Sequence, residues 1–309
     1  MKTLIGVLAI ATASVAFAAV PPRPAIISIS HIAVYAADPV KSEHYYVHDL
    51  GATKRSDPEN PKGVRYYFDN TQFVEVLPLP GGPVSINRLD HVAFNTLDVR
   101  ALRAYLVSSR VAVTQAIHQG SDASEWLDVT DPEGNRIEFV QMAPGERALP
   151  EIPRNPLSSH IIHVGFIVHD SVREDAFFRT VLGFRPYWHG GMQDNQTNWI
   201  SQQVPDGTDW LEYMIVGTPE GHGIPPDMKA ATLGVLDHFS LGVPNAESAY
   251  TVLWNGERLK GQSEVPKIGR DGKWQLNLFD PDGTRTEFME FHAVGKPCCS
   301  PFTASDPKQ

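Results

Sequence analysis

The sequence predicts an α+β fold with antiparallel or mixed sheets, built from four copies of a βαβββ module. Three observations predict this fold. Four segments begin with a β-branched strand that carries an early histidine, and each segment ends with a strand that carries a glutamate. The separation between histidine and glutamate stays between 44 and 49 residues in all four segments. A pattern that recurs at this length indicates duplication of one structural unit.

The opening and closing strands define the modules in chain order. The opening strands read ISHIAVYAADP, LDHVAFNTLDV, IIHVGFIVHDS and LDHFSLGVPNA, and they supply His31, His91, His163 and His238. The closing strands read QFVEVLPL, NRIEFVQM, DWLEYMIV and TRTEFMEF, and they supply Glu75, Glu138, Glu212 and Glu287. Apolar and polar residues alternate along these strands with a period of two, as expected for half-buried sheets. Each module therefore contributes one histidine and one glutamate.

Two further motifs indicate that the modules were duplicated as a pair. In the first and third modules a predicted helix, at residues 40–50 and 170–182, ends in Leu-Gly, and Gly51 and Gly183 are natural C-caps. The second and fourth modules share the turn motifs DPEG and DPDG, with proline second and glycine fourth. In both, the glutamate follows four residues after that glycine. The order of the modules is therefore A-B-A′-B′.

Composition places the boundary between two domains in a proline-rich segment. Residues 144–158 hold four prolines and read as a linker. A chain of 309 residues also exceeds the common size of one domain. We expect a first domain at 28–143, with modules at 28–80 and 88–143, and a second at 159–294, with modules at 159–217 and 235–294.

Residues 1–18 have the composition of a secretory signal peptide. Lys2 precedes an uncharged apolar run over residues 4–17, and residues 16–18 form a small-residue cleavage pattern. A membrane anchor needs about 20 apolar residues, whereas Thr12 and Ser14 interrupt this run. We therefore expect cleavage after residue 18, a periplasmic or secreted location, and no membrane-spanning segment in the mature protein.

Charge and cysteine content narrow the possible partners. A formal net charge of −10 without long charge runs argues against phosphate neutralisation, so nucleic acid is not expected as a partner. The two cysteines, Cys298 and Cys299, are adjacent and cannot form a zinc cluster; a ring with each other or a bridge between chains stays open. Residues 295–309 contain three prolines, and we expect a disordered tail without an assigned role. The mature protein is expected to be a monomer or a homodimer.

The four glutamates need an explanation, because an unpaired buried carboxylate is costly. Each one stands between apolar neighbours, as Glu75 does in FVEV. Taken singly, each glutamate could be the solvent-facing residue of its strand, and each histidine could be a hydrogen-bonded sheet residue. Recurrence in four modules favours a site instead. Two modules together offer two imidazoles and two carboxylates, which suits Zn²⁺, Ni²⁺, Mn²⁺ or Fe²⁺ and leaves room for substrate oxygens.

The repeated module, its opening histidine and the DPxG turn before the last glutamate resemble the vicinal oxygen chelate superfamily of glyoxalases, bleomycin-resistance proteins and extradiol dioxygenases. This resemblance covers nearly the whole chain after the signal peptide. It implies that two modules form a cup-shaped mixed sheet around one divalent metal ion. The implied ligands are His31, Glu75, His91 and Glu138 in the first half and His163, Glu212, His238 and Glu287 in the second. Among these, Glu138 and Glu287 are the implied catalytic groups.

The resemblance leaves the pairing of the modules open. Dioxygenase-like members pair neighbouring modules, whereas glyoxalase I-like members exchange partners, which here would pair the first module with the fourth. Either arrangement gives each site two histidines and two glutamates.

Three functions agree with this resemblance. The first is a glyoxalase I-like lyase or isomerase on a small oxygenated carbonyl substrate, in which a glutamate moves the proton. The complete ligand set favours it, although export argues against an intracellular glutathione adduct. The second is a non-haem iron dioxygenase with the triad His163, His238 and Glu287. Ile268 and Asn277 stand where that family has an acid-base histidine and tyrosine. The third is a non-catalytic small-molecule binding protein, against which the retained ligands argue.

Residues outside the ligand set are less informative. The longest loop within a module, residues 188–199, is either a cover for the third module or simply exposed. Three basic residues of the fourth module would attract an anionic substrate or be ordinary surface residues: Lys267, Arg270 and Lys273. Three tryptophans are interpreted as packing residues: Trp126, Trp210 and Trp274.

Overall fold

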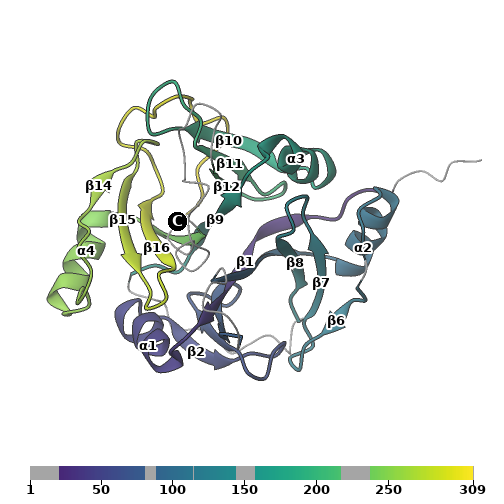
Figure 1. The fold of residues 1–309 in the computed structure, drawn as a ribbon, viewed down its shortest axis with the longest axis horizontal. Coiled ribbons are helices and arrows are strands. Elements are labelled where there is room, and N and C mark those ends of the chain that lie inside the picture. The colour runs from purple at the N-terminus through teal and green to yellow at the C-terminus, as the bar shows by residue number, and fades with distance from the viewer. Residues whose placement is uncertain (1–20, 81–87, 114, 144–156, 217–236, 309) are drawn as a thin grey trace, which may run out of the picture.

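Two curled eight-stranded sheets, one from each half of the chain, form the computed structural model (Figure 1). It describes residues 21–80, 88–113, 115–143, 157–216 and 237–308. The predicted signal peptide and residues 144–156 of the predicted linker lie outside these ranges. Among the described residues, no helix has the length and hydropathy needed to span a bilayer. The predicted α+β fold with repeated modules is confirmed.

The first sheet has the strand order β2-β3-β4-β1-β5-β8-β7-β6. The elements of the first module are β1 (Ile26–Ala36), α1 (Pro39–Glu43), the π-helical turn η1 (His44–Asp49), β2 (Thr53–Ser56), β3 (Val64–Tyr67) and β4 (Phe73–Pro78). Those of the second are β5 (Leu89–Thr96), α2 (Val99–Ser108), β6 (His118–Gln119), β7 (Glu125–Thr130) and β8 (Arg136–Gln141). Strands β1 and β5 pair antiparallel at the centre, and β4 and β8 flank them in parallel.

The second sheet repeats this topology in the order β10-β11-β12-β9-β13-β16-β15-β14. The elements of the third module are β9 (Ile161–Val168), α3 (Ser171–Asp175), the π-helical turn η3 (Ala176–Val181), β10 (Arg185–Gly190), β11 (Trp199–Gln203) and β12 (Trp210–Ile215). Those of the fourth are β13 (His238–Val243), α4 (Ala246–Asn255), β14 (Lys267–Ile268), β15 (Trp274–Phe279) and β16 (Arg285–Glu290). Neighbouring modules therefore share each sheet, which decides the pairing that the sequence left open.

The A-type helices begin and end as their sequences predict. Asp38 caps α1 by accepting hydrogen bonds from the backbone of Val40 and Lys41, and Pro39 occupies the first turn. The last turn widens to a π-helix, because the Leu50 amide bonds to the Tyr45 carbonyl at 2.9 Å. The predicted C-caps are confirmed, since Gly51 and Gly183 adopt φ values of 75° and 81°.

The two DPxG turns close as predicted and position the last strand of each B-type module. The amide of Gly134 bonds to the carbonyl of Asp131 at 3.2 Å, and that of Gly283 bonds to the carbonyl of Asp280 at 3.0 Å. Both glycines have positive φ, which a side chain would disfavour. The Asp280 carboxylate also accepts a hydrogen bond at 3.0 Å from the hydroxyl of Tyr46, in the other half of the chain.

One large apolar cluster connects the two halves. The ring of Phe94 meets that of Phe184 edge to face at 5.2 Å, and both belong to the large buried cluster that spans both sheets. Gln72 extends this interface with a polar contact, because its side-chain amide donates to the Ile161 carbonyl at 2.9 Å. Burial of apolar surface is the main stabilising contribution at such an interface. The opposite face of each sheet, which carries the predicted ligands, lies on the inner side of the curl.

The C-terminal segment, residues 295–308, for which composition predicts disorder, makes specific contacts with the rest of the chain. This segment packs against the third and fourth modules, where the Thr303 amide bonds to the Tyr187 carbonyl at 2.9 Å. The carboxylate of Asp306 accepts a hydrogen bond from the buried ammonium of Lys273 at 2.9 Å. Cys298 and Cys299 form a disulfide with each other. Composition alone did not reveal these contacts, because their partners lie far away in the sequence.

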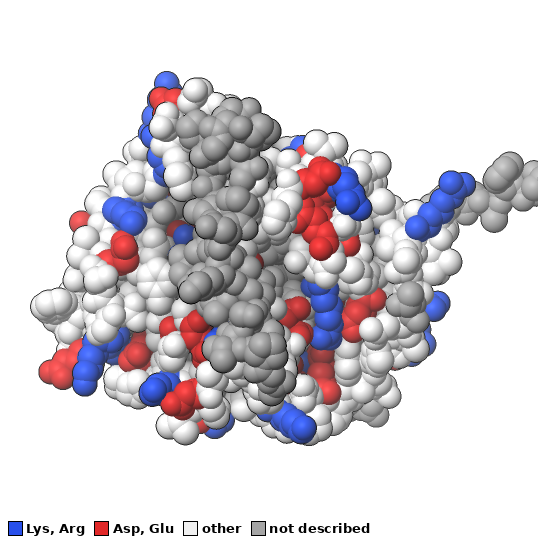
Figure 2. All heavy atoms as spheres, in the orientation of Figure 1, with Lys and Arg blue, Asp and Glu red and all other residues white. Residues whose placement is uncertain are grey.

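On the face drawn in Figure 2, lysine and arginine side chains alternate with aspartate and glutamate side chains over the described surface. The basic groups do not form a continuous stripe on this face. The mixture agrees with the acidic net charge of the chain.

Candidate metal centres

Strand register brings the four predicted ligands of the first half to one face of its sheet. Ala33 on β1 pairs with Glu75 on β4 and with His91 on β5. Directly paired residues point to the same face, and so do residues two apart on one strand. His31 therefore shares that face, and its partner Ala93 brings in Glu138 on β8.

The second half repeats this arrangement. Gly165 on β9 pairs with Glu212 on β12 and His238 on β13, while Ser240 pairs with His163 on β9 and Glu287 on β16. Gly165 is required by close approach, because a Cβ atom there would lie 2.1 Å from Cε1 of His238. In each sheet the four central strands therefore direct their histidine and glutamate side chains toward one place.

In the first half the four side chains are close together and buried. Nε2 of His31 lies 2.8 Å from Nε2 of His91. A Glu75 oxygen lies 3.6 Å from each of these nitrogens, and Glu138 oxygens lie 3.5 Å from the His31 nitrogen and 3.7 Å from the His91 nitrogen. The interpretation of these glutamates as solvent-facing strand residues is therefore wrong for this half.

In the second half three pairs of the corresponding atoms lie at similar distances. Nε2 of His163 lies 3.1 Å from Nε2 of His238 and 3.1 Å from a Glu287 oxygen. A Glu212 oxygen lies 3.4 Å from the His238 nitrogen. Glu212 is the most exposed of the four, with 14% of its side chain accessible.

Both clusters fit a divalent metal ion. Nitrogen and oxygen ligands about 2.1 Å from one tetrahedral ion lie roughly 3.4 Å from each other, close to the separations found here. One oxygen each of Glu75 and Glu138 is buried without a hydrogen-bond partner, as expected of an atom that awaits a ligand. His91 donates from Nδ1 to Asp90 at 2.7 Å, which directs the lone pair on Nε2 into the cluster.

An arginine beside the first cluster forms ion pairs with the carboxylates around it. The sequence did not identify this arginine as a site residue. Arg136 on β8 contacts Asp90 at 2.8 Å, Asp128 at 2.7 Å and Glu138 at 3.2 Å. Burial nevertheless raises the pKa of the Glu138 carboxyl well above its usual value, and neighbouring carboxylates raise it further. Burial also lowers the pKa of the His31 imidazole and keeps it neutral, the form that binds metal.

In the second cluster the pKa values of the glutamates are lowered, whereas the pKa of Glu138 in the first cluster is raised. Burial would raise the pKa of Glu287, but its hydrogen bond to His163 and the charges of His163 and Arg285 hold that pKa at about 2. Burial would also raise the pKa of Glu212, but the hydrogen bond to His238 and the charges of His163 and His238 together lower it. Burial lowers the pKa of His238 as well. Both glutamates are therefore ionised at neutral pH.

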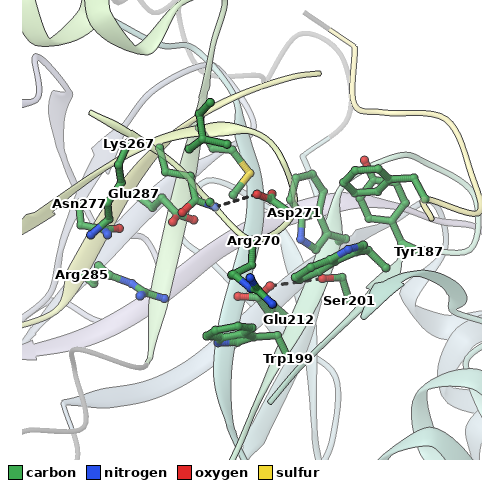
Figure 3. Close-up of a pocket in the computed structure, with 17 residues that line it drawn as sticks. Tyr187, Trp199, Ser201, Glu212, Lys267, Arg270, Asp271, Asn277, Arg285 and Glu287 are labelled. Atoms are coloured by element: carbon green, nitrogen blue, oxygen red, sulfur yellow. Dashed lines mark hydrogen bonds between the residues drawn. The ribbon is translucent and has the colours of Figure 1, made fainter. Parts of the chain in front are cut away.

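The two clusters face cavities of different size and chemistry. The cavity beside Glu75 and His91 measures about 170 Å³ and is walled by Trp126 and Arg136. The cavity beside Glu212 and Glu287 measures about 320 Å³ (Figure 3). Its walls are aromatic and basic, and they include Tyr187, Trp188, Trp199, Trp210, Arg270 and Arg285.

The structure also shows where the tryptophans and basic residues outside the predicted ligand set lie. Trp126 and Trp210 line the cavities and do not only pack, and Lys267 and Arg270 line the second cavity. Lys273 is fully buried and is not a surface residue. The arginines at 136 and 285 were missed, although their position two residues before a predicted ligand places them on the same face of the strand.

Comparison with known proteins agrees with this architecture. A family model described as Glyoxalase/Bleomycin resistance protein/Dioxygenase superfamily matches residues 28–139 and 160–288. No curated protein matches the sequence.

Among solved structures, an extradiol ring-cleaving dioxygenase from B. fuscum is 18% identical, with a TM-score of 0.61, covering 92% of this chain and 76% of that one. A catechol 2,3-dioxygenase is 14% identical, with a TM-score of 0.61, covering 89% and 95%. A substrate complex of homoprotocatechuate 2,3-dioxygenase from Brevibacterium fuscum is 16% identical, with a TM-score of 0.60, covering 92% and 93%. At these identities the likeness concerns the fold.

Proposed function

The chain belongs to the glyoxalase/bleomycin resistance protein/dioxygenase superfamily, and from this premise we propose that its second half is a metal-dependent lyase or isomerase site for a small oxygenated carbonyl substrate. One observation carries the proposal. The second cluster brings His163, His238 and Glu287 together, with the ionised Glu212 3.4 Å from His238, beside a cavity of about 320 Å³, a size within the range of small-molecule sites.

His163, His238, Glu287 and Glu212 would hold the ion. When bound, it supplies a Lewis acid that polarises adjacent substrate oxygens. The protein supplies the base: Glu212 lines the cavity and accepts a hydrogen bond from Ser201 at 3.3 Å. The resemblance gave the catalytic role in this half to Glu287, but Glu212 lies farther from its histidine, at 3.4 Å against 3.1 Å, and is more exposed. We therefore assign to Glu212, in place of Glu287, the transfer of a proton from one substrate carbon to the next.

Ring-cleaving dioxygenation is the second candidate. It is favoured by the pairing of neighbouring modules and by the triad His163, His238 and Glu287, whose ligand atoms lie within 4.8 Å of one another. Ile268 and Asn277 argue against it. Both side chains line the second cavity, where that chemistry requires an acid-base histidine and tyrosine.

Elemental analysis of the mature protein, purified without chelators, tests the metal assignment. The double variant H163A/H238A should lose the metal of the second half, and H31A/H91A is the matched control in the first half. Metal content of H163A/H238A equal to that of the wild type would contradict the ligand assignment.

Two assays on the metal-loaded protein distinguish a lyase or isomerase from a dioxygenase. A lyase or isomerase exchanges a substrate C–H hydrogen with solvent deuterium under anaerobic conditions, in a panel of hemithioacetals and α-hydroxycarbonyl compounds. A dioxygenase instead consumes O₂ with catechols. Deuterium exchange that is unchanged in Glu212→Gln would contradict the assignment of the base.

Export forms part of this proposal. The N-terminal pattern of residues 1–18 supports cleavage and a periplasmic or secreted mature protein. Cell fractionation and the intact mass of the full-length gene product check it. A product that retains Met1 in the cytoplasm would contradict it.

A further inference from the structure

Arg285 lines the second cavity, and its guanidinium forms no ion pair with a carboxylate of the described residues. It lies on β16 two residues before Glu287, and both side chains line the cavity (Figure 3). Its Nε atom is buried without a hydrogen-bond partner. Within the described part of the chain, no carboxylate oxygen lies within 4.0 Å of this guanidinium, whereas Arg65, Arg88 and Arg136 all have such partners. The side chain as a whole is half-buried, so the guanidinium is reached from the cavity and its unpaired Nε donor is available to an anionic ligand.

The repeat provides an internal control for this observation. Arg136 occupies the same place on β8, two residues before Glu138, and contacts three carboxylates between 2.7 and 3.2 Å. Asp128, one of these, pairs with Glu138 across β7 and β8. At the matching position of the second half, Asn277 pairs with Glu287 across β15 and β16. The amide carries no charge, so Arg285 is not neutralised as Arg136 is.

The other cations of the second cavity already have partners. Arg270 donates to the carbonyl of Gly191 at 3.0 Å and pairs with Asp194. Lys267 pairs with Glu264 at 2.9 Å. Among the described residues that line this cavity, Arg285 is the cation that remains for an anionic ligand.

The aromatic wall of the cavity favours a flat ligand. Tyr187, Trp188, Trp199 and Trp210 line it opposite β15 and β16, and Figure 3 shows Trp199 and Tyr187 facing the side from which Arg285 and Asn277 project. Indole and phenol rings favour flat partners through stacked or edge-to-face contacts. Asn277 can add a hydrogen bond, because its side-chain oxygen has no partner.

We propose that the second cavity binds a small aromatic carboxylate, with the carboxylate paired to Arg285 and the ring packed against the tryptophans. This inference rests on the proposed function in one respect, namely that the cavity is the substrate site. Glu212 and Glu287 lie in the same cavity and repel an anion until a cation offsets their charge. Binding of the carboxylate is therefore expected to tighten when a divalent metal is present.

Benzoate and its neutral isostere benzamide are suitable probes. Their binding to the full mature chain is followed by tryptophan fluorescence and by calorimetry, with and without Zn²⁺. The wild type should bind benzoate more tightly than benzamide. Arg285→Gln should weaken benzoate by about 10- to 100-fold, the size of a lost charged hydrogen bond, and leave benzamide within about twofold. Lys267→Gln removes the same charge from the same cavity and should change benzoate affinity by less than about twofold.

The outcomes separate this inference from the metal assignment, because zinc content is measured on the same samples. Loss of benzoate binding in Arg285→Gln with zinc content retained supports the proposal. Equal benzoate affinity in Arg285→Gln and wild type overturns it, as does equal affinity of the wild type for benzoate and benzamide. If the wild type takes up no zinc, the proposed function fails, and the metal-free titrations still decide the role of Arg285.

Discussion

Replacement of Asp306 by asparagine tests whether the C-terminal segment is part of the folded second half. The Lys273 ammonium is fully buried and bonds to the Phe291 carbonyl at 2.6 Å, the Asp306 carboxylate at 2.9 Å and the Tyr187 hydroxyl at 3.2 Å. Of these three partners, only Asp306 carries a charge. Asparagine keeps the shape and removes the counter-charge.

The expected cost follows from the burial of this pair. Removal of one partner from a buried ion pair costs about 3–5 kcal/mol. Two features reduce this: the Asp306 side chain is 23% exposed, and the ammonium lies 5.0 to 5.7 Å from the ring centroids of Tyr187, Trp210 and Phe302. We therefore expect Asp306→Asn to lower the free energy of unfolding by about 2 kcal/mol, or about 4–8 °C in melting temperature.

Guanidinium denaturation at pH 7, followed by circular dichroism, measures this loss. His292 also pairs with Asp306, at 2.9 Å on the exposed side, and His292→Gln should change the free energy by less than about 0.5 kcal/mol. Equal stability of Asp306→Asn and wild type would refute the reasoning.

The pH dependence gives a second check on the same pair. Burial would raise the pKa of Asp306, but hydrogen bonds from Lys273, Tyr187 and His292 lower it below its unfolded value of about 4. A depressed carboxyl pKa contributes stability that is present above the unfolded value and is lost as pH falls through the folded value. The difference between wild type and Asp306→Asn should therefore shrink below about pH 4.

Two further predictions concern other buried positions. Gly165→Ala should displace His238, because the added Cβ would lie 2.1 Å from the ring; elemental analysis should show metal lost from the second half, and unchanged content would contradict the packing argument. Burial and the charges of Asp131 and Glu133 raise the pKa of Glu174 from 4.5 to about 8. A raised carboxyl pKa contributes stability that is present below about pH 4.5 and lost as pH rises through about 8, so Glu174→Gln should be more stable than wild type at pH 9 but not at pH 5. Equal stability at pH 9 would contradict this.

Much of the fold could be predicted because the repeat is local. Each module has its histidine, its helix-ending glycine or DPxG turn, and its glutamate within one segment, so Gly51 and Asp131 could be interpreted without knowledge of distant residues. The same repetition identified the eight candidate ligands, which the structure brings together in two groups of four. The alternation of each strand decided which residues share a face.

Other features depend on contacts between distant segments. Residues 295–308 contact partners in distant segments; Asp306, for example, contacts Lys273 and Tyr187, which lie 33 and 119 residues before it. Composition described this segment as disordered because a proline-rich tail has little apolar surface of its own. The apolar surface that it covers belongs to another module.

The sequence by itself determined the four modules, the presence of one histidine and one glutamate in each, and the resulting set of candidate metal ligands. The tertiary structure decided that neighbouring modules share a sheet, that Arg136 is neutralised, and that Arg285 is left in an open cavity. The physical reason is that alternation along a strand is a short-range property. Pairing of charges depends on distances of about 3 to 4 Å between strands, and only the assembled sheet sets these.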